Sequence, residues 1–108
     1  MTIYDARSYT AAQGNRVRKG GTEDSSSYTN CEIKFCGIPN IHSVRDLYND
    51  LFTSCLEQTD PKVDSHLEVL EKILSYSDEV AQTVLSGKSV LVHCSDGWDR
   101  TSQLCATA

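Results

Sequence analysis

The sequence of 108 residues contains no apolar run long enough to cross a bilayer, and its first residues lack the pattern of a secretory signal peptide. Its five cysteines are an odd number, and none of them has the C-x2-C spacing of a zinc site. With a formal net charge of −5, the chain also lacks the basic surplus typical of nucleic-acid binding. These absences predict a cytoplasmic protein with reduced thiols and no nucleic-acid partner.

The hydrophobic pattern predicts a single α/β domain. Residues 31–36 alternate between apolar and polar side chains and are expected to form a strand, and residues 1–4 are expected to end another. The short apolar run at 90–92 is typical of a fully buried strand. Residues 8–30 are rich in Gly, Ser, Thr and charge, so we expect a long loop there.

Two helices are expected between these strands because apolar residues recur at helical spacing. One begins at Ser43, with Ser43 and Asp46 in an N-cap arrangement. The other runs to about Leu85 and begins with a capping box formed by Ser65 and Glu68. In each helix these apolar residues form a stripe along one side.

The most informative segment follows the last expected strand, where Cys94 is separated by five residues from Arg100 and Thr101. A cysteine thiol has a pKa of about 8.5, and positive potential lowers this value. The backbone N–H groups of the intervening loop, the helix expected to start near Arg100 and the guanidinium itself all supply such potential. Gly97 allows the backbone to approach an anion closely.

This spacing predicts a cysteine-dependent phosphatase. Cys94 is expected to be the nucleophile and Arg100 a bidentate clamp on two phosphoryl oxygens. Because the loop and the arginine neutralise the phosphate, we expect no metal or other cofactor. The alternative is a buried structural cysteine that follows a strand, with a solvated arginine beyond it.

The same loop contains two carboxylates, Asp96 and Asp99, which repel both a thiolate and a phosphate. Neighbouring negative charge raises the pKa of a carboxyl group, which suits a general acid. We expect Asp99 to protonate the leaving oxygen and then to activate water, and Asp96 to shape the loop or contact substrate. Alternatively, either carboxylate points outward or holds the arginine.

The string HCSDGWDRT at residues 93–101 resembles the active-site signature of the myotubularin-related phosphoinositide 3-phosphatases. DARSYTAA at 5–12, Asn15 with Arg16, and GIPNIH at 37–42 also resemble stretches of that family. The resemblance covers most of the chain and is weaker between about residues 59 and 85. It implies a partial phosphatase domain over residues 1–108, with a protein tyrosine phosphatase-like fold whose strand, phosphate loop and helix lie at the C-terminus.

The resemblance implies removal of the 3-phosphate from phosphatidylinositol 3-phosphate and phosphatidylinositol 3,5-bisphosphate through a cysteinyl-phosphate intermediate. It also implies headgroup contacts from a larger set of residues, namely Asn15, Asn40, Ile41, Ser95, Asp96, Gly97, Trp98, Asp99 and Arg100. It further implies peripheral contact with endosomal membranes through domains outside these residues. Homo- or hetero-oligomers with related phosphatases are implied as well.

Family members continue well beyond the position of Ala108, so we expect a truncated domain with little or no activity of its own. One rival hypothesis is a non-catalytic fragment that binds only a headgroup or a partner protein. Another is a phosphotyrosine phosphatase, which shares the Cys-x5-Arg logic but not the two loop aspartates. Residues 6–22 contain four cations and no carboxylate, which indicates either an anion-binding segment or a solvated loop; the cations are Arg7, Arg16, Arg18 and Lys19.

Overall fold

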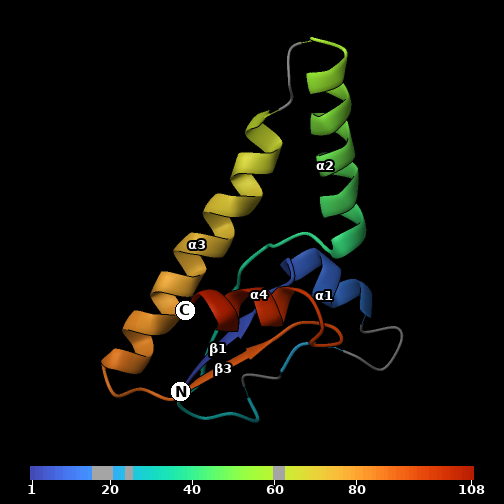
Figure 1. Ribbon diagram of the computed structural model, residues 1–108. Helices are drawn as coiled ribbons and strands as arrows, with labels where there is room; N and C mark the ends of the chain where they lie inside the picture. Colours follow the sequence, from blue (N-terminus) through green and yellow to red (C-terminus); the bar gives the residue numbers. More distant parts are fainter. Residues whose placement is uncertain (16–20, 24–25, 60–62) are drawn as a thin grey trace.

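The computed structural model describes residues 1–15, 21–23, 26–59 and 63–108. In chain order its elements are β1 (Thr2–Asp5), α1 (Tyr9–Asn15), β2 (Glu32–Phe35), α2 (Ile41–Leu56), α3 (Val63–Leu85), β3 (Val90–His93) and α4 (Arg100–Thr107). The three strands form one parallel sheet in the order β2-β1-β3 (Figure 1). The predicted α/β class is therefore confirmed.

The central strand, β1, determines where the other two strands end. Asp5 is paired with Phe35 on one side and with His93 on the other, so all three strands finish at the same edge of the sheet. Pairing continues past this C-terminal edge, because the Ala6 N–H donates to the His93 carbonyl at 2.8 Å and the Ile38 N–H donates to the Ala6 carbonyl at 3.0 Å. The three segments that follow the strands are thus held side by side.

The core lies between one face of the sheet and the helices α3 and α4. Its buried members come from the sheet, its C-terminal edge and these two helices: Tyr4, Ala6, Cys36, Ile38, Val80, Cys94 and Leu104. The Ser77 hydroxyl on α3 donates to the Leu104 carbonyl on α4 at 3.3 Å, which ties the two helices together. Because Cys94 belongs to this core, packing fixes the start of the loop that follows it.

A short helix, α1, occupies part of the segment that the sequence predicted to be a loop, so that prediction is wrong for residues 9–15. The Ser8 hydroxyl oxygen accepts a hydrogen bond from the Ala11 N–H at 3.2 Å, in the manner of an N-cap. Ala12 is fully buried, and the Tyr9 ring packs edge-on against Phe35 with ring centroids 5.3 Å apart. These contacts stabilise a helix too short to form alone.

The starts of the two long helices also differ from the sequence prediction. Asn40, not Ser43, is the N-cap of α2: its side-chain oxygen accepts from the N–H groups of His42 and Ser43, both at 3.0 Å. Helix α3 is already helical at Val63, so Ser65 lies inside its first turn rather than at its cap. Asparagine and serine are comparable N-caps, so residue type alone could not show that Asn40 rather than Ser43 caps α2.

The predicted apolar stripes of α2 and α3 are only partly buried. Helix α2 buries none of its residues completely, and Phe52 is 53% exposed. Helix α3 buries Val69, Ser77 and Val80, whereas Leu74 is 61% exposed. The two helices approach each other at the end far from the sheet and diverge toward it (Figure 1). The α2 stripe therefore faces little packed structure among the described residues.

The last strand, β3, was predicted to be buried on both faces, and this is wrong. Val90 and Val92 pack against the core, but Leu91, which points to the opposite face, is 43% exposed. The strand lies at an edge of the sheet, where β1 pairs with one side of it. A short apolar run does not distinguish a central strand from an edge strand that is covered on one face.

Candidate active site

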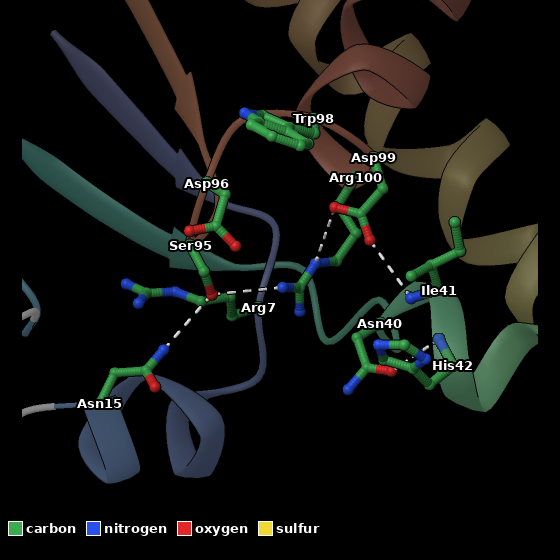
Figure 2. Close-up of a pocket in the computed structure, with 10 residues that line it drawn as sticks. All are labelled: Arg7, Asn15, Asn40, Ile41, His42, Ser95, Asp96, Trp98, Asp99 and Arg100. Atoms are coloured by element: carbon green, nitrogen blue, oxygen red, sulfur yellow. Dashed lines mark hydrogen bonds and ion pairs between the residues drawn. The ribbon is translucent and has the colours of Figure 1, made fainter. Parts of the chain in front are cut away.

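A pocket of about 1160 Å³ opens at the C-terminal edge of the sheet, between the loop after β3 and the start of α2 (Figure 2). Its lining combines the three segments that follow the strands: Arg7 and Asn15 after β1, Asn40, Ile41 and His42 after β2, and Ser95, Asp96, Trp98, Asp99 and Arg100 after β3. All the predicted headgroup residues except Gly97 therefore lie around one pocket. Parallel strands bring these distant segments together because their carboxyl ends share an edge.

Cys94 lies at the base of the loop and is 7% exposed. The loop turns back over its sulfur, and the Gly97 N–H donates to Sγ at 3.2 Å. Gly97 has a φ of +82°, a conformation that side-chain-bearing residues rarely adopt. The glycine is thus needed for the turn that aims the loop N–H groups at the sulfur, although it does not line the pocket.

The surroundings of Cys94 favour its thiolate form. Burial raises the pKa of the thiol, but hydrogen bonds from the Thr101 hydroxyl and from the N–H groups of Thr101, Gly97 and Asp96 outweigh burial and leave the pKa below its ordinary value. The Thr101 hydroxyl oxygen is buried and has no fixed hydrogen-bond partner among the described residues, so the hydroxyl can turn toward the sulfur. The sequence placed Thr101 in the motif but assigned no role to it.

Arg100 is 8% exposed and lines the pocket, yet its charge is only weakly paired. Its Nη2 donates to the Ser95 hydroxyl at 3.3 Å, and its Nε is 3.7 Å from Asp99 Oδ1. Within the described part of the chain, Nε is buried without a hydrogen-bond acceptor. A buried guanidinium in this condition gains much from an oxyanion that enters the pocket.

Asp99 does not have the raised pKa that the sequence predicted. Partial burial raises the pKa of its carboxyl group, but the N–H and charge of Arg100, together with the N–H groups of Asp99 itself and Ile41, outweigh burial and lower the pKa below its ordinary value. The sequence argument counted only the neighbouring negative charges. It missed the backbone N–H groups, one of which comes from a helix 58 positions away in the chain.

Ser95 connects the loop to the opposite wall of the pocket. Its hydroxyl oxygen accepts hydrogen bonds from Asn15 Nδ2 and from Arg100 Nη2, each at 3.3 Å (Figure 2). Trp98 is 88% exposed, more than any other large hydrophobic side chain in the described ranges, and it lines the pocket. Asn15 is therefore hydrogen-bonded to the loop that follows β3, and the Trp98 indole is accessible to solvent and to a bound ligand.

Arg7 lines the pocket, a role that sequence reasoning assigned only as one of two alternatives for a basic segment. It is not a solvated loop residue: it is 4% exposed, and its Nε and Nη2 donate to both carboxylate oxygens of Asp5. This hydrogen bonding to Asp5 raises the pKa of Arg7. The other three cations of the segment, at positions 16, 18 and 19, lie outside the described residues.

A second carboxylate stands beside Asp5. His93 Nε2 is 3.9 Å from Asp5 Oδ2 and 3.3 Å from Glu23 Oε1. His93 Nε2 thus lies near carboxylates from two other segments, although it is buried without a hydrogen-bond partner among the described residues. The D-x-R pattern at residues 5–7 could have indicated the pairing of Asp5 with Arg7, because a buried arginine needs a charged partner and an aspartate two positions away can supply it.

Across residues 1–15, 21–23, 26–59 and 63–108, no group of three or more His, Cys, Asp or Glu side chains is arranged to hold a metal ion. Likewise, none of the helices in the described ranges is long and apolar enough to cross a membrane. The side chains that line the pocket include two guanidinium groups, two amides and two aspartates, and Cys94 lies beneath the loop without lining the pocket.

A buried low-pKa cysteine, a loop of N–H donors and a weakly paired arginine define a candidate thiol-dependent phosphatase site. Residues 1–108 match the family model described as the myotubularin-like phosphatase domain, and the chain belongs to this family. Over its whole length it is 44% identical to the proteins of Mus musculus and Homo sapiens named phosphatidylinositol-3,5-bisphosphate 3-phosphatase MTMR4, and 40% identical to Myotubularin of Xenopus laevis. It spans 10% of the former and 19% of the latter.

Proposed function

We propose that this domain serves a phosphoinositide 3-phosphatase that removes the 3-phosphate from phosphatidylinositol 3-phosphate and phosphatidylinositol 3,5-bisphosphate. One observation carries the proposal: one loop holds the Cys94 thiol, whose pKa is lowered, at its base and places the weakly paired Arg100 guanidinium in the pocket. The names of the relatives support the substrate class. The Cys94 and Arg100 pair supports the reaction class.

In the first proposed step, the Cys94 thiolate attacks phosphorus, so that an S–P bond forms while the P–O bond to the inositol ring breaks. The lowered pKa of Asp99 leaves its carboxyl group ionised at neutral pH, and the Cys94 thiol, which donates a hydrogen bond to Asp99 Oδ1, supplies the proton. Asp99 then gives this proton to the departing oxygen, which leaves as the inositol hydroxyl. Arg100 and the loop N–H groups stabilise the charge on the transferring phosphoryl oxygens. The 3.8 Å distance between Cys94 Sγ and Asp99 Oδ1 supports the assignment of nucleophile and acid to these two residues.

In the second proposed step, water attacks the cysteinyl-phosphate. The S–P bond breaks, the sulfur recovers its electron pair as a thiolate, and the Asp99 carboxylate accepts a proton from the water. Inorganic phosphate then leaves. Every proton is accounted for by Asp99, so the cycle requires no metal ion and no redox partner.

The test is release of inorganic phosphate by the intact protein from vesicles that contain each of the two lipids. Cys94→Ser is expected to abolish release, because a hydroxyl is a far weaker nucleophile than a thiolate at neutral pH. The matched control is Cys105→Ser, which changes an exposed cysteine on α4 and is expected to leave release unchanged. If Cys94→Ser retains turnover within a few-fold of the wild type, the proposed mechanism is wrong.

The same assay separates the rival functions. A non-catalytic binding module would bind the vesicles without releasing phosphate. The observation that favours such a module is the set of exposed apolar side chains on α2 and α3, which could contact a partner protein. A phosphotyrosine phosphatase would release phosphate from a phosphotyrosine peptide faster than from either lipid. We expect the lipids to be preferred.

We also propose that the intact protein is cytoplasmic and works peripherally at endosomal membranes, because a lipid phosphatase must reach its substrate at a membrane surface. It is proposed to do so through domains outside residues 1–108 and in homo- or hetero-oligomers with related phosphatases. Co-localisation of the tagged intact protein with an endosomal marker, and its mass in solution, test these two statements.

A further inference from the structure

We infer that Ile41, through its backbone N–H, is a positioning residue that orients Asp99 and sets its acidity. This inference rests on the proposed function, in which Asp99 is the general acid. It concerns the peptide N–H and not the apolar side chain of Ile41. It also gives Ile41 a role other than the headgroup contact that the sequence predicted.

The two carboxylate oxygens of Asp99 face different elements. Oδ2 accepts a hydrogen bond from the Ile41 N–H at 3.2 Å, and Oδ1 is 3.7 Å from Arg100 Nε (Figure 2). Oδ1 also accepts from Cys94 Sγ at 3.8 Å. The Ile41 N–H therefore points one oxygen at α2 and leaves the other beside the sulfur. A carboxylate anchored at one oxygen has one orientation for proton transfer from the other.

The first turn of α2 explains why this N–H serves Asp99. The Asn40 side chain accepts from the N–H groups of His42 and Ser43, and the Asn40 carbonyl accepts from the Val44 N–H. The Ile41 N–H is the remaining donor of the turn, and Asp99 accepts it. Because α2 is 16 residues long, its N-terminal dipole adds to the attraction for a carboxylate.

Several charged or titratable groups surround Asp99. Arg100 and the N–H of Ile41 stabilise its ionised form, whereas the Cys94 thiolate and the Asp96 carboxylate, on the same loop, oppose it. His42 on α2 and Arg7 after β1 line the same pocket. Removal of the Ile41 N–H leaves all the other groups in place, so its effect on Asp99 can be measured separately.

The consequence appears in the acidic limb of the pH profile. The first step needs an ionised Cys94 and a protonated Asp99, and the lowered pKa of Asp99 makes it the more acidic of the two groups, so the acidic limb of kcat/KM has its midpoint at the pKa of this carboxyl group in the free protein. A hydrogen bond to the carboxylate stabilises the ionised form and moves this limb to lower pH. Without the hydrogen bond the limb moves to higher pH, by roughly half to one pH unit for a single backbone N–H.

Ile41→Pro removes this N–H with little change to the backbone. Ile41 is the first helical residue, where proline is well tolerated, and Asn40 has φ −74° and ψ 168°, the extended conformation that a residue before proline prefers. Ile41→Ala is the matched control, because it loses the side chain but keeps the N–H. We expect the acidic limb of kcat/KM on phosphatidylinositol 3-phosphate to move to higher pH in the proline variant only.

An unchanged limb in Ile41→Pro would overturn the inference, and so would equal shifts in both variants, which would assign the effect to the side chain. A second measurement needs no proline. With ¹⁵N-isoleucine in the intact protein, the Ile41 amide resonance is expected to titrate with Asp99 and to stop titrating in Asp99→Asn. If the Ile41 amide resonance shifts with pH in the same way in the wild type and in Asp99→Asn, the inference is also refuted.

These outcomes are distinguishable from failure of the proposed function. If the wild type releases no phosphate at any pH, the proposed function fails, while the isoleucine titration still reports whether the N–H holds Asp99. If the wild type is active and the two isoleucine experiments are negative, only the inference on Ile41 fails.

Discussion

At the residue scale, the two buried arginines of the pocket have opposite environments. Arg7 is fully paired with Asp5, so its charge supports the fold beneath the pocket. Arg100 has no carboxylate within hydrogen-bond distance among the described residues, so its charge remains available for a bound anion. Sequence alone could not separate these roles, because both residues are arginines in motif-like segments.

The pKa of the Cys94 thiol provides a prediction at the same scale. Thr101→Val removes the hydroxyl that lowers this pKa, so the pKa is expected to rise and the thiolate to form at higher pH. The measurement is the rate of alkylation by iodoacetamide against pH, with the Cys94 adduct identified by mass spectrometry. The curve is expected to move to higher pH in Thr101→Val.

The control for this experiment is Thr107→Val, the same substitution at the far end of α4, where the hydroxyl donates only to the Gln103 carbonyl. Its curve is expected to match that of the wild type. Equal curves for Thr101→Val and the wild type would contradict the role given to the Thr101 hydroxyl. Buried Cys36 is a useful internal reference, because burial raises its pKa to about 12 and it should not react below that pH.

At the scale of elements, the sequence predicted the strand, loop and helix around Cys94 and the existence of both long helices. It failed at α1 and at the helix caps. The reason is physical: α1 depends on Phe35, which lies some twenty residues further along the chain, and the cap of α2 depends on which polar side chain reaches the free N–H groups. Periodicity reports neither kind of contact.

The cap of α2 can be tested directly. Asn40→Ala removes the acceptor for two backbone N–H groups and is expected to lower the free energy of unfolding by about 0.5–2 kcal/mol. Ser43→Ala changes the cap that the sequence predicted, and is expected to have an effect below about 0.5 kcal/mol. Denaturant unfolding measures both. A larger loss for Ser43→Ala than for Asn40→Ala would contradict the cap seen in the structure.

At the scale of the whole molecule, the pocket exists because a parallel sheet collects three distant segments at one edge. The sequence predicted most of the pocket residues through the family resemblance, but not which of them touch. It also predicted an apolar stripe on each long helix, and the structure leaves much of both stripes exposed. Burial of a face depends on what lies opposite, and an apolar stripe on one helix carries no information about that.

The exposed apolar residues lead to a stability prediction. Phe52→Ser and Leu74→Gln replace side chains that are more than half exposed, and each is expected to change the free energy of unfolding by less than about 0.5 kcal/mol. Val80→Ala, in the buried core, is expected to cost about 1–3 kcal/mol. Denaturant unfolding of residues 1–108 provides the comparison.

A large loss of stability in either exposed variant would mean that these faces are covered in solution, and a mass measurement would then reveal association between copies. Val80→Ala removes fewer apolar atoms than Phe52→Ser, so a larger loss of stability in Val80→Ala cannot be explained by the amount of side chain removed. The expected difference in stability comes from the burial of Val80 in the core and the exposure of Phe52 and Leu74.

The central position of β1 has a consequence for how chains of this kind can vary in length. Each residue of a strand adds about 3.3 Å, so one residue inserted into or deleted from β1 would displace Arg7 and Asn15, which follow it, relative to the segments that follow β2 and β3. The C-terminal end of α2 and the N-terminal end of α3 lie far from the sheet and contribute no residue to the pocket (Figure 1). Relatives are therefore free to lengthen or shorten there, while the four residues of β1 must keep their number.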